Sequence, residues 1–179
     1  MADTLYARIW LGRLAYALCS FLILFIGLVP LGFTPRFLPQ PDVLLCLTLA
    51  FALRRPDFVP VWLLALVFLL SDILLMRPVG LWTAIVILAV EMTRLQEYRF
   101  RELVFPFEWA YVAGVILLAL IVNRVVLSLA LVPQLSFGTV MLHFLFTALI
   151  YPLIVAFCVL LLRLHKVTPD EAIRYGHRL

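Results

Sequence analysis

Residues 107–132 read FEWAYVAGVILLALIVNRVVLSLALV, and this stretch carries only two charged side chains, Glu108 and Arg124. A helix rises about 1.5 Å per residue, and a helix needs about 20 apolar residues to cross a bilayer. The stretch is therefore long and apolar enough to span a membrane. Residues 137–162, directly after it, form a second stretch of the same kind. Together they predict an all-α integral membrane protein.

The composition of the whole chain agrees with this fold class. Of its 179 residues, 66% are hydrophobic, and the mean hydropathy is +1.15. A soluble domain is usually about 45–50% apolar, so lipid must cover much of this surface. The net charge of +4 is small. It follows from the placement of arginines beside membrane spans, and we expect no nucleic-acid partner.

Short polar turns divide the chain into six apolar spans within one transmembrane domain. The predicted spans are residues 10–31, 41–55, 58–75, 79–93, 107–132 and 137–162. Residues 163–179 follow as a short basic tail that we expect to lie in the cytoplasm. The sequence thus predicts a six-helix transmembrane bundle without a separate soluble domain.

The second span is short. Its apolar part, residues 43–53, would be only about 16 Å long as a helix. We expect Pro41 and Asp42 to extend it at one end, with Arg54 and Arg55 snorkelling to the interface at the other. A re-entrant segment is the alternative. A re-entrant second segment would leave five spans and would put Arg94, Arg99 and Arg101 on the outer side of the membrane, which the charge bias opposes.

The distribution of basic residues predicts the orientation of the bundle. Short cytoplasmic loops carry an excess of Lys and Arg. With six spans, eleven of the fourteen basic residues fall on one side of the membrane. Both termini are therefore predicted to be cytoplasmic. The eleven residues are Arg8, Arg13, Arg54, Arg55, Arg94, Arg99, Arg101, Arg163, Lys166, Arg174 and Arg178.

Four polar residues within the spans are candidate functional residues, because ionisable groups are costly in a membrane. They are Asp72, Asn123, Arg124 and His143. We predict that Asp72 pairs with Arg124 in the interior, with Asn123 or His143 completing the hydrogen bonds. Alternatively, Asp72 and Arg124 reach the interface, and His143 is a hydrogen-bonded packing residue.

Ala110 and Gly114 form a small-xxx-small pattern on the fifth span. Such a pattern permits two membrane helices to approach closely. It predicts a docking site for the helix of a partner protein, with packing inside the bundle as the alternative.

The sequence contains no motif of a known enzyme class that we recognise. It has no G-x-S-x-G, H-E-x-x-H or P-loop pattern. The three cysteines are scattered through apolar spans and do not have metal-ligand spacing. We therefore expect no catalytic residues, metal or cofactor.

Residues 40–92 carry a series of short motifs. QPDVLL at 40–45 opens a short span that closes at RRP, residues 54–56. LLSDIL at 69–74 and RPVGL at 77–81 follow. This series resembles the rod shape-determining protein MreD family of bacteria. One departure is that Leu69 and Leu70 precede the aspartate where the family usually has glycine and leucine.

The resemblance covers about a third of the chain, and the remainder matches in hydropathy and length. The motif residues that it assigns are Pro41, Asp42, Asp72, Pro78 and Gly80. It implies a non-enzymatic scaffold of the cell-elongation (Rod) complex in the bacterial cytoplasmic (inner) membrane. Such a scaffold binds the single-span periplasmic protein MreC. It is thereby linked to the actin-like MreB filament, the RodA polymerase and a transpeptidase.

A second class of function fits the sequence as well. A six-helix membrane protein with polar residues near one face could be the small-ligand-binding subunit of a transporter. This function would require an outward-open cavity around Asp72, Arg124 and His143. A scaffold would instead have a closed, filled interior.

Overall fold

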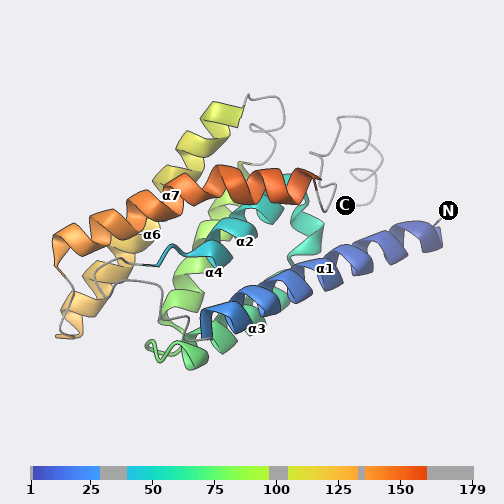
Figure 1. The fold of residues 1–179 in the computed structure, drawn as a ribbon. Coiled ribbons are helices and arrows are strands. Elements are labelled where there is room, and N and C mark those ends of the chain that lie inside the picture. The colour runs from blue at the N-terminus through green and yellow to red at the C-terminus, as the bar shows by residue number, and fades with distance from the viewer. Residues whose placement is uncertain (1, 29–39, 97–104, 133–135, 161–179) are drawn as a thin grey trace.

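The computed structural model describes residues 2–28, 40–96, 105–132 and 136–160, with the side chains from residue 6 onwards in the first range. The described residues form six α-helices and one short 3-10 helix (Figure 1), which confirms the all-α prediction. The helices are α1 (Ala2–Leu28), α2 (Val43–Arg54), η1 (Pro56–Phe58), α3 (Val61–Leu74), α4 (Leu81–Leu95), α6 (Phe105–Leu129) and α7 (Phe137–Leu160).

Each predicted span overlaps one of the α-helices, but some boundaries differ. The helix α1 begins at Ala2, eight residues before the predicted span at residue 10. Hydropathy predicts only the part of a helix that lipid can cover, so the more polar first two turns of α1 were not predicted. The predicted tail, residues 163–179, lies outside the described residues.

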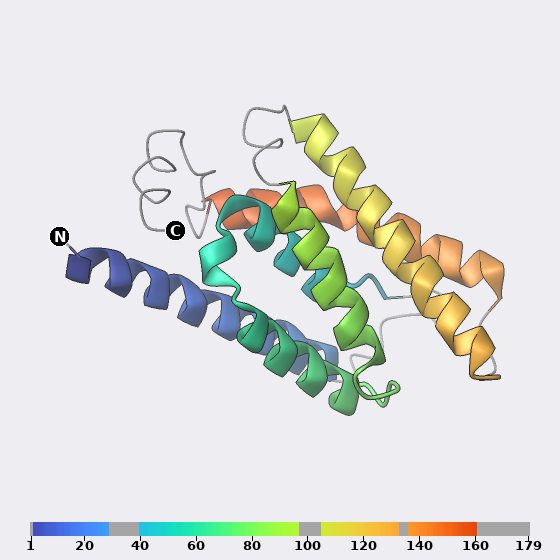
Figure 2. The same ribbon diagram turned by 180° about the vertical axis from the view of Figure 1, so that it is seen from behind.

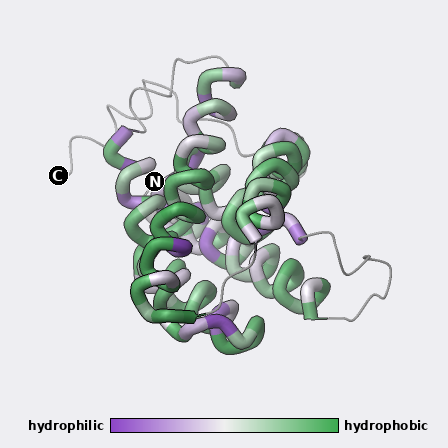
Figure 3. Tube along the Cα trace, turned by 90° about the vertical axis from the view of Figure 1, so that its left-hand side faces the viewer, coloured by the Kyte–Doolittle hydropathy of each residue, from purple (hydrophilic) through white to green (hydrophobic). Residues whose placement is uncertain are grey.

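Among the described residues, three helices have the length and composition to cross a membrane. They are the apolar part of α1 (Tyr6–Leu28), α6 and α7. The apolar helices α2 and α3 are shorter. Hydrophobic residues predominate along the described helices in Figure 3. These features are those of a multi-pass membrane protein.

The short helix α2 lies at the centre of the bundle. Every residue from Leu44 to Arg54 is buried, and α2 contacts α1, α4 and α7 (Figures 1 and 2). A helix that is hydrophobic on all sides is expected to be buried. Because other helices surround it, α2 does not need the length of a lipid-exposed span. The prediction that Arg54 and Arg55 extend the span by snorkelling to the interface is wrong, since both side chains are buried in the protein.

Side-chain hydrogen bonds connect α2 to the helices on two of its sides. The hydroxyl groups of Tyr16 on α1 and Thr48 on α2 lie 2.9 Å apart. On the other side, the Cys46 thiol donates to the carbonyl oxygen of Thr147 on α7, at 3.3 Å. Polar contacts of this kind help to hold helices together where the hydrophobic effect contributes little.

A close contact fixes where α1 crosses η1. A Cβ atom placed on Gly12 would lie 2.5 Å from the ring of Phe58, whereas one placed on Gly27 would have no atom within 4 Å. We expect Gly12→Ala to lower the free energy of unfolding by about 1–3 kcal/mol, because the ring must move. Gly27→Ala is the matched control and should be neutral or slightly stabilising. Thermal unfolding in detergent measures both, and equal stability of the two variants would contradict the contact.

Candidate functional site

Asp42 lies at the N-terminal end of α2, where several elements meet. Its Oδ1 atom accepts a hydrogen bond from the Leu45 N–H at 3.0 Å, so Asp42 is the N-cap of the helix. The predicted span begins at Pro41, whereas the helix itself begins at Val43. Its backbone N–H donates to the Thr147 hydroxyl at 3.2 Å, and its Oδ2 atom lies 3.7 Å from Nη1 of Arg77. One aspartate thus connects α2 to α7 and to the α3–α4 turn.

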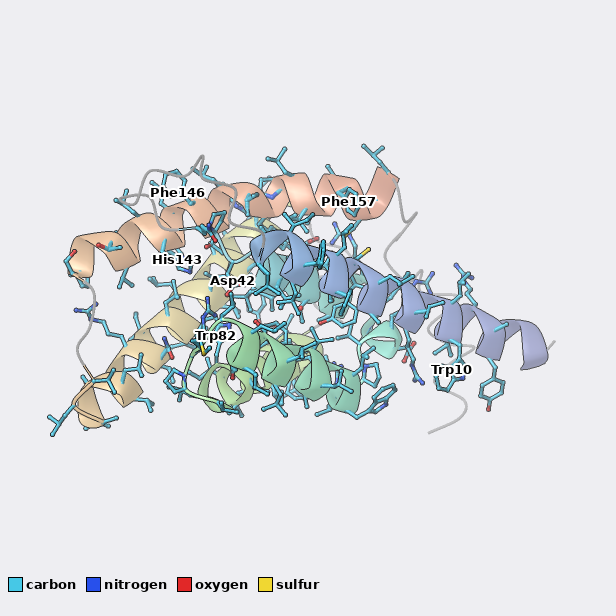
Figure 4. The ribbon with its side chains drawn as sticks, turned by 60° about the horizontal axis from the view of Figure 1, so that its bottom comes forward. Trp10, Asp42, Trp82, His143, Phe146 and Phe157 are labelled. Carbon is cyan, nitrogen blue, oxygen red and sulfur yellow. The ribbon has the colours of Figure 1, made fainter. Side chains whose placement is uncertain are left out.

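Arg77 extends this group of contacts. Its guanidinium lies 5.7 Å from the ring centre of Trp82, in a cation–π contact. His143 on α7 lies near both Asp42 and Arg77. Figure 4 shows Asp42 between the labelled side chains of Trp82 and His143. The residues that meet around Asp42 are thus Arg77, Trp82, His143 and Thr147.

Asp72 is fully buried and has its partners close by in the sequence. Its Oδ2 atom accepts hydrogen bonds from the Gly80 N–H at 3.0 Å, the Thr83 N–H at 3.3 Å and the Thr83 hydroxyl at 2.9 Å. The carboxylate therefore caps α4 from the preceding helix, a favourable position at the positive end of the helix dipole. Gly80 makes this turn with a φ of +86°, a conformation that glycine adopts readily.

The predicted pair between Asp72 and Arg124 is not formed. Arg124 is half-buried on α6, and its guanidinium lies 5.8 Å from the ring centre of Phe137. It faces an open groove that neither Asp72 nor His143 lines. Asn123, the neighbour of Arg124, is also half-buried. His143 lies near Asp42 and Arg77 and does not line the Arg124 groove, so the predicted cluster divides into separate sites.

A buried ion pair that was not predicted from the sequence lies at the other end of α2. Nη1 of Arg54 and Oε1 of Glu108 on α6 are 2.6 Å apart, and the two side chains are 6% and 0% exposed. The Tyr151 hydroxyl on α7 donates to the same oxygen at 3.0 Å. The pair therefore joins α2, α6 and α7. One signal was available: Glu108 precedes Val112 and Ile116 at helical spacing, on the buried face of α6.

A second pair is more exposed. Nη1 of Arg94 lies 2.6 Å from Oε1 of Glu91, one turn earlier on α4, and the Glu91 side chain is 45% exposed. Arg94 also donates to the carbonyl oxygen of Val59. This surface pair provides a natural comparison for the buried one.

The two predicted docking residues lie on the outside of α6. Ala110 and Gly114 are both exposed. A Cβ atom placed on Gly114 would have no atom within 4 Å. Packing of Gly114 inside the bundle, the alternative from the sequence, is therefore wrong.

Among the described residues, no group of three or more His, Cys, Asp or Glu side chains is placed to hold a metal ion. Comparisons of the chain with protein families, curated proteins and solved structures found no match. The contacts described above chiefly join helices, and the charged groups at both ends of α2 stabilise the arrangement of the bundle.

Proposed function

We propose that this chain is a non-enzymatic membrane scaffold of the bacterial Rod complex, as its resemblance to the MreD family implies. The observation that supports this most is where the motif residues lie. Asp42 caps α2 and reaches Arg77, while Asp72 caps α4 through Gly80. The motif carboxylates are thus engaged in shaping the bundle. This role suits a scaffold better than an enzyme.

In this proposal the chain crosses the bacterial cytoplasmic membrane six times, with both termini in the cytoplasm. The excess of Lys and Arg on one side supports this orientation. The helix arrangement supports an even number of crossings, because α1 begins and α7 ends at the same end of the bundle (Figures 1 and 2). The contacts of α2 favour a crossing helix over a re-entrant segment, because Asp42 at its start reaches Arg77 in the α3–α4 turn and Arg54 at its end pairs with Glu108 in the first turn of α6.

The direct partner in this proposal is an MreC-like protein with a single membrane helix. Through it the chain would be linked to MreB, RodA and the transpeptidase. Helices associate in lipid chiefly by close packing, and small residues permit that packing. The exposed face around Ala110 and Gly114 is suited to receive such a helix, because a side chain could approach the backbone of α6 there.

We expect Gly114→Leu to reduce recovery of the MreC-like partner with the tagged chain by about fivefold or more, because a large side chain would separate the two helices. The variant should fold normally, since the new side chain points into open space. Gly138→Leu is the matched control, because Gly138 on α7 is equally open. Co-purification in mild detergent, together with thermal unfolding of each variant, measures both effects. Unchanged recovery with Gly114→Leu would reject this docking site.

The ligand-binding transporter subunit is the other candidate function. It would bring Asp72, Arg124 and His143 around one cavity. Instead, Asp72 is enclosed beneath the α3–α4 turn, and Arg124 faces a groove on α6. We therefore prefer the scaffold.

A further inference from the structure

An open groove of about 490 Å³ lies at the C-terminal end of α6. It is lined by Arg124, Val125, Ser128, Leu131 and Val132. Arg124 is the one charged residue in this lining, and Val125, Leu131 and Val132 are exposed apolar residues. The groove thus combines a cation with an apolar wall.

Two contacts define how the groove residues are oriented. The Arg124 guanidinium rests 5.8 Å from the ring centre of Phe137, at the first residue of α7. This contact directs the side chain toward the end of the bundle where α6 ends and α7 begins. The Ser128 hydroxyl donates to the Val125 carbonyl oxygen at 2.7 Å, so it turns back to its own helix. The small Ser128 side chain therefore does not fill the groove, and Arg124 supplies its positive charge.

The groove lies at a defined depth. The helix α6 has 25 residues and is about 37 Å long, whereas the hydrocarbon core of a bilayer is about 30 Å thick. Arg124 is five residues before the last residue, Leu129, or about 7.5 Å along the axis. A centred helix would place the Arg124 backbone just inside the hydrocarbon edge. Its long side chain then reaches the headgroup region.

We propose that this groove binds a phospholipid in the leaflet that meets the C-terminal end of α6, with the lipid phosphate on Arg124. The planar guanidinium matches a phosphate with two parallel hydrogen bonds. The glycerol and the first acyl carbons would lie against Val125 and Leu131. Because Arg124 gives the described lining of the groove a positive charge, an anionic lipid such as phosphatidylglycerol should bind more tightly than a zwitterionic one. This site is separate from the scaffold function and does not depend on it.

The test is native mass spectrometry of the delipidated full chain, titrated with phosphatidylglycerol. We expect Arg124→Gln to weaken binding of the tightest lipid by about tenfold, because a charge-assisted contact is lost. Arg8→Gln, which removes an exposed arginine from α1, is the control and should bind as the wild type does. A second variant, Ser128→Trp, fills the groove while keeping Arg124, and it should also weaken binding. Because Ser128 is exposed, this variant should fold even if Arg124→Gln does not.

The competitor distinguishes a lipid site from a phosphate site. Inorganic phosphate at the same concentration should leave the lipid bound, because most of the contact is with the glycerol and acyl groups. Displacement by inorganic phosphate would overturn the lipid assignment. Wild-type affinity in either Arg124→Gln or Ser128→Trp would overturn the site itself.

Discussion

Replacing Arg54 by methionine is expected to lower the free energy of unfolding by about 3–5 kcal/mol. The reason is that Glu108 is completely buried and 2.6 Å from Arg54. Removal of the arginine takes a cation 2.6 Å away from a buried carboxylate, in a medium of low dielectric constant, and the attraction that offset the desolvation of the carboxylate is lost. The hydrogen bond from Tyr151 to Glu108 is neutral and does not replace that attraction. Unfolding of the purified chain in detergent measures the loss.

Two further variants separate charge from packing. Arg54→Met with Glu108→Gln removes both charges and keeps an oxygen acceptor for Tyr151, so it should recover at least half of the loss. Glu91→Gln breaks the more exposed pair with Arg94 and should cost less than about 1 kcal/mol. If Arg54→Met and Glu91→Gln were equally stable, the buried pair would not have the role that we assign to it.

Asp72→Ala should lower the free energy of unfolding by about 2–3 kcal/mol. The substitution removes the acceptor for the Gly80 N–H, the Thr83 N–H and the Thr83 hydroxyl. These donors begin α4, so the hairpin of α3 and α4 should loosen first. Hydrogen exchange of the amides at the start of α4, together with unfolding in detergent, measures the effect.

The control for this variant is Asp57→Ala. Asp57 is exposed on η1, and its loss should change stability by less than about 0.5 kcal/mol. A charge swap gives a second check. Because Asp72 and Arg124 do not form a pair, Asp72→Arg combined with Arg124→Asp should be no more stable than the worse single variant. Restoration by the swap would contradict the structure.

The sequence predicted the helices well, because hydropathy reports directly on burial in lipid. It did not predict which helix lies inside the others. The helix α2 was the least convincing span by length, yet it occupies the centre of the bundle. A short apolar segment looks the same whether lipid or protein surrounds it, so its environment appears only when the helices are assembled.

The polar contacts were harder to predict, for a related reason. Asp72 was expected to need a distant cation, but neighbouring backbone N–H groups and a threonine hydroxyl accommodate its charge. Arg54 was assigned to the interface because it ends a span. The carboxylate that holds it, Glu108, is 54 residues away on another helix. Such pairs depend on how helices pack, and one sequence does not contain that information in a readable form.

The most direct test of the proposed function is mass spectrometry of the proteins that co-purify with the tagged chain from its native membrane in mild detergent. The scaffold proposal predicts recovery of a single-span periplasmic coiled-coil protein together with wall-synthesis enzymes. Recovery of a pair of ATPases with a coupling membrane subunit would contradict it and would assign the chain to a transporter.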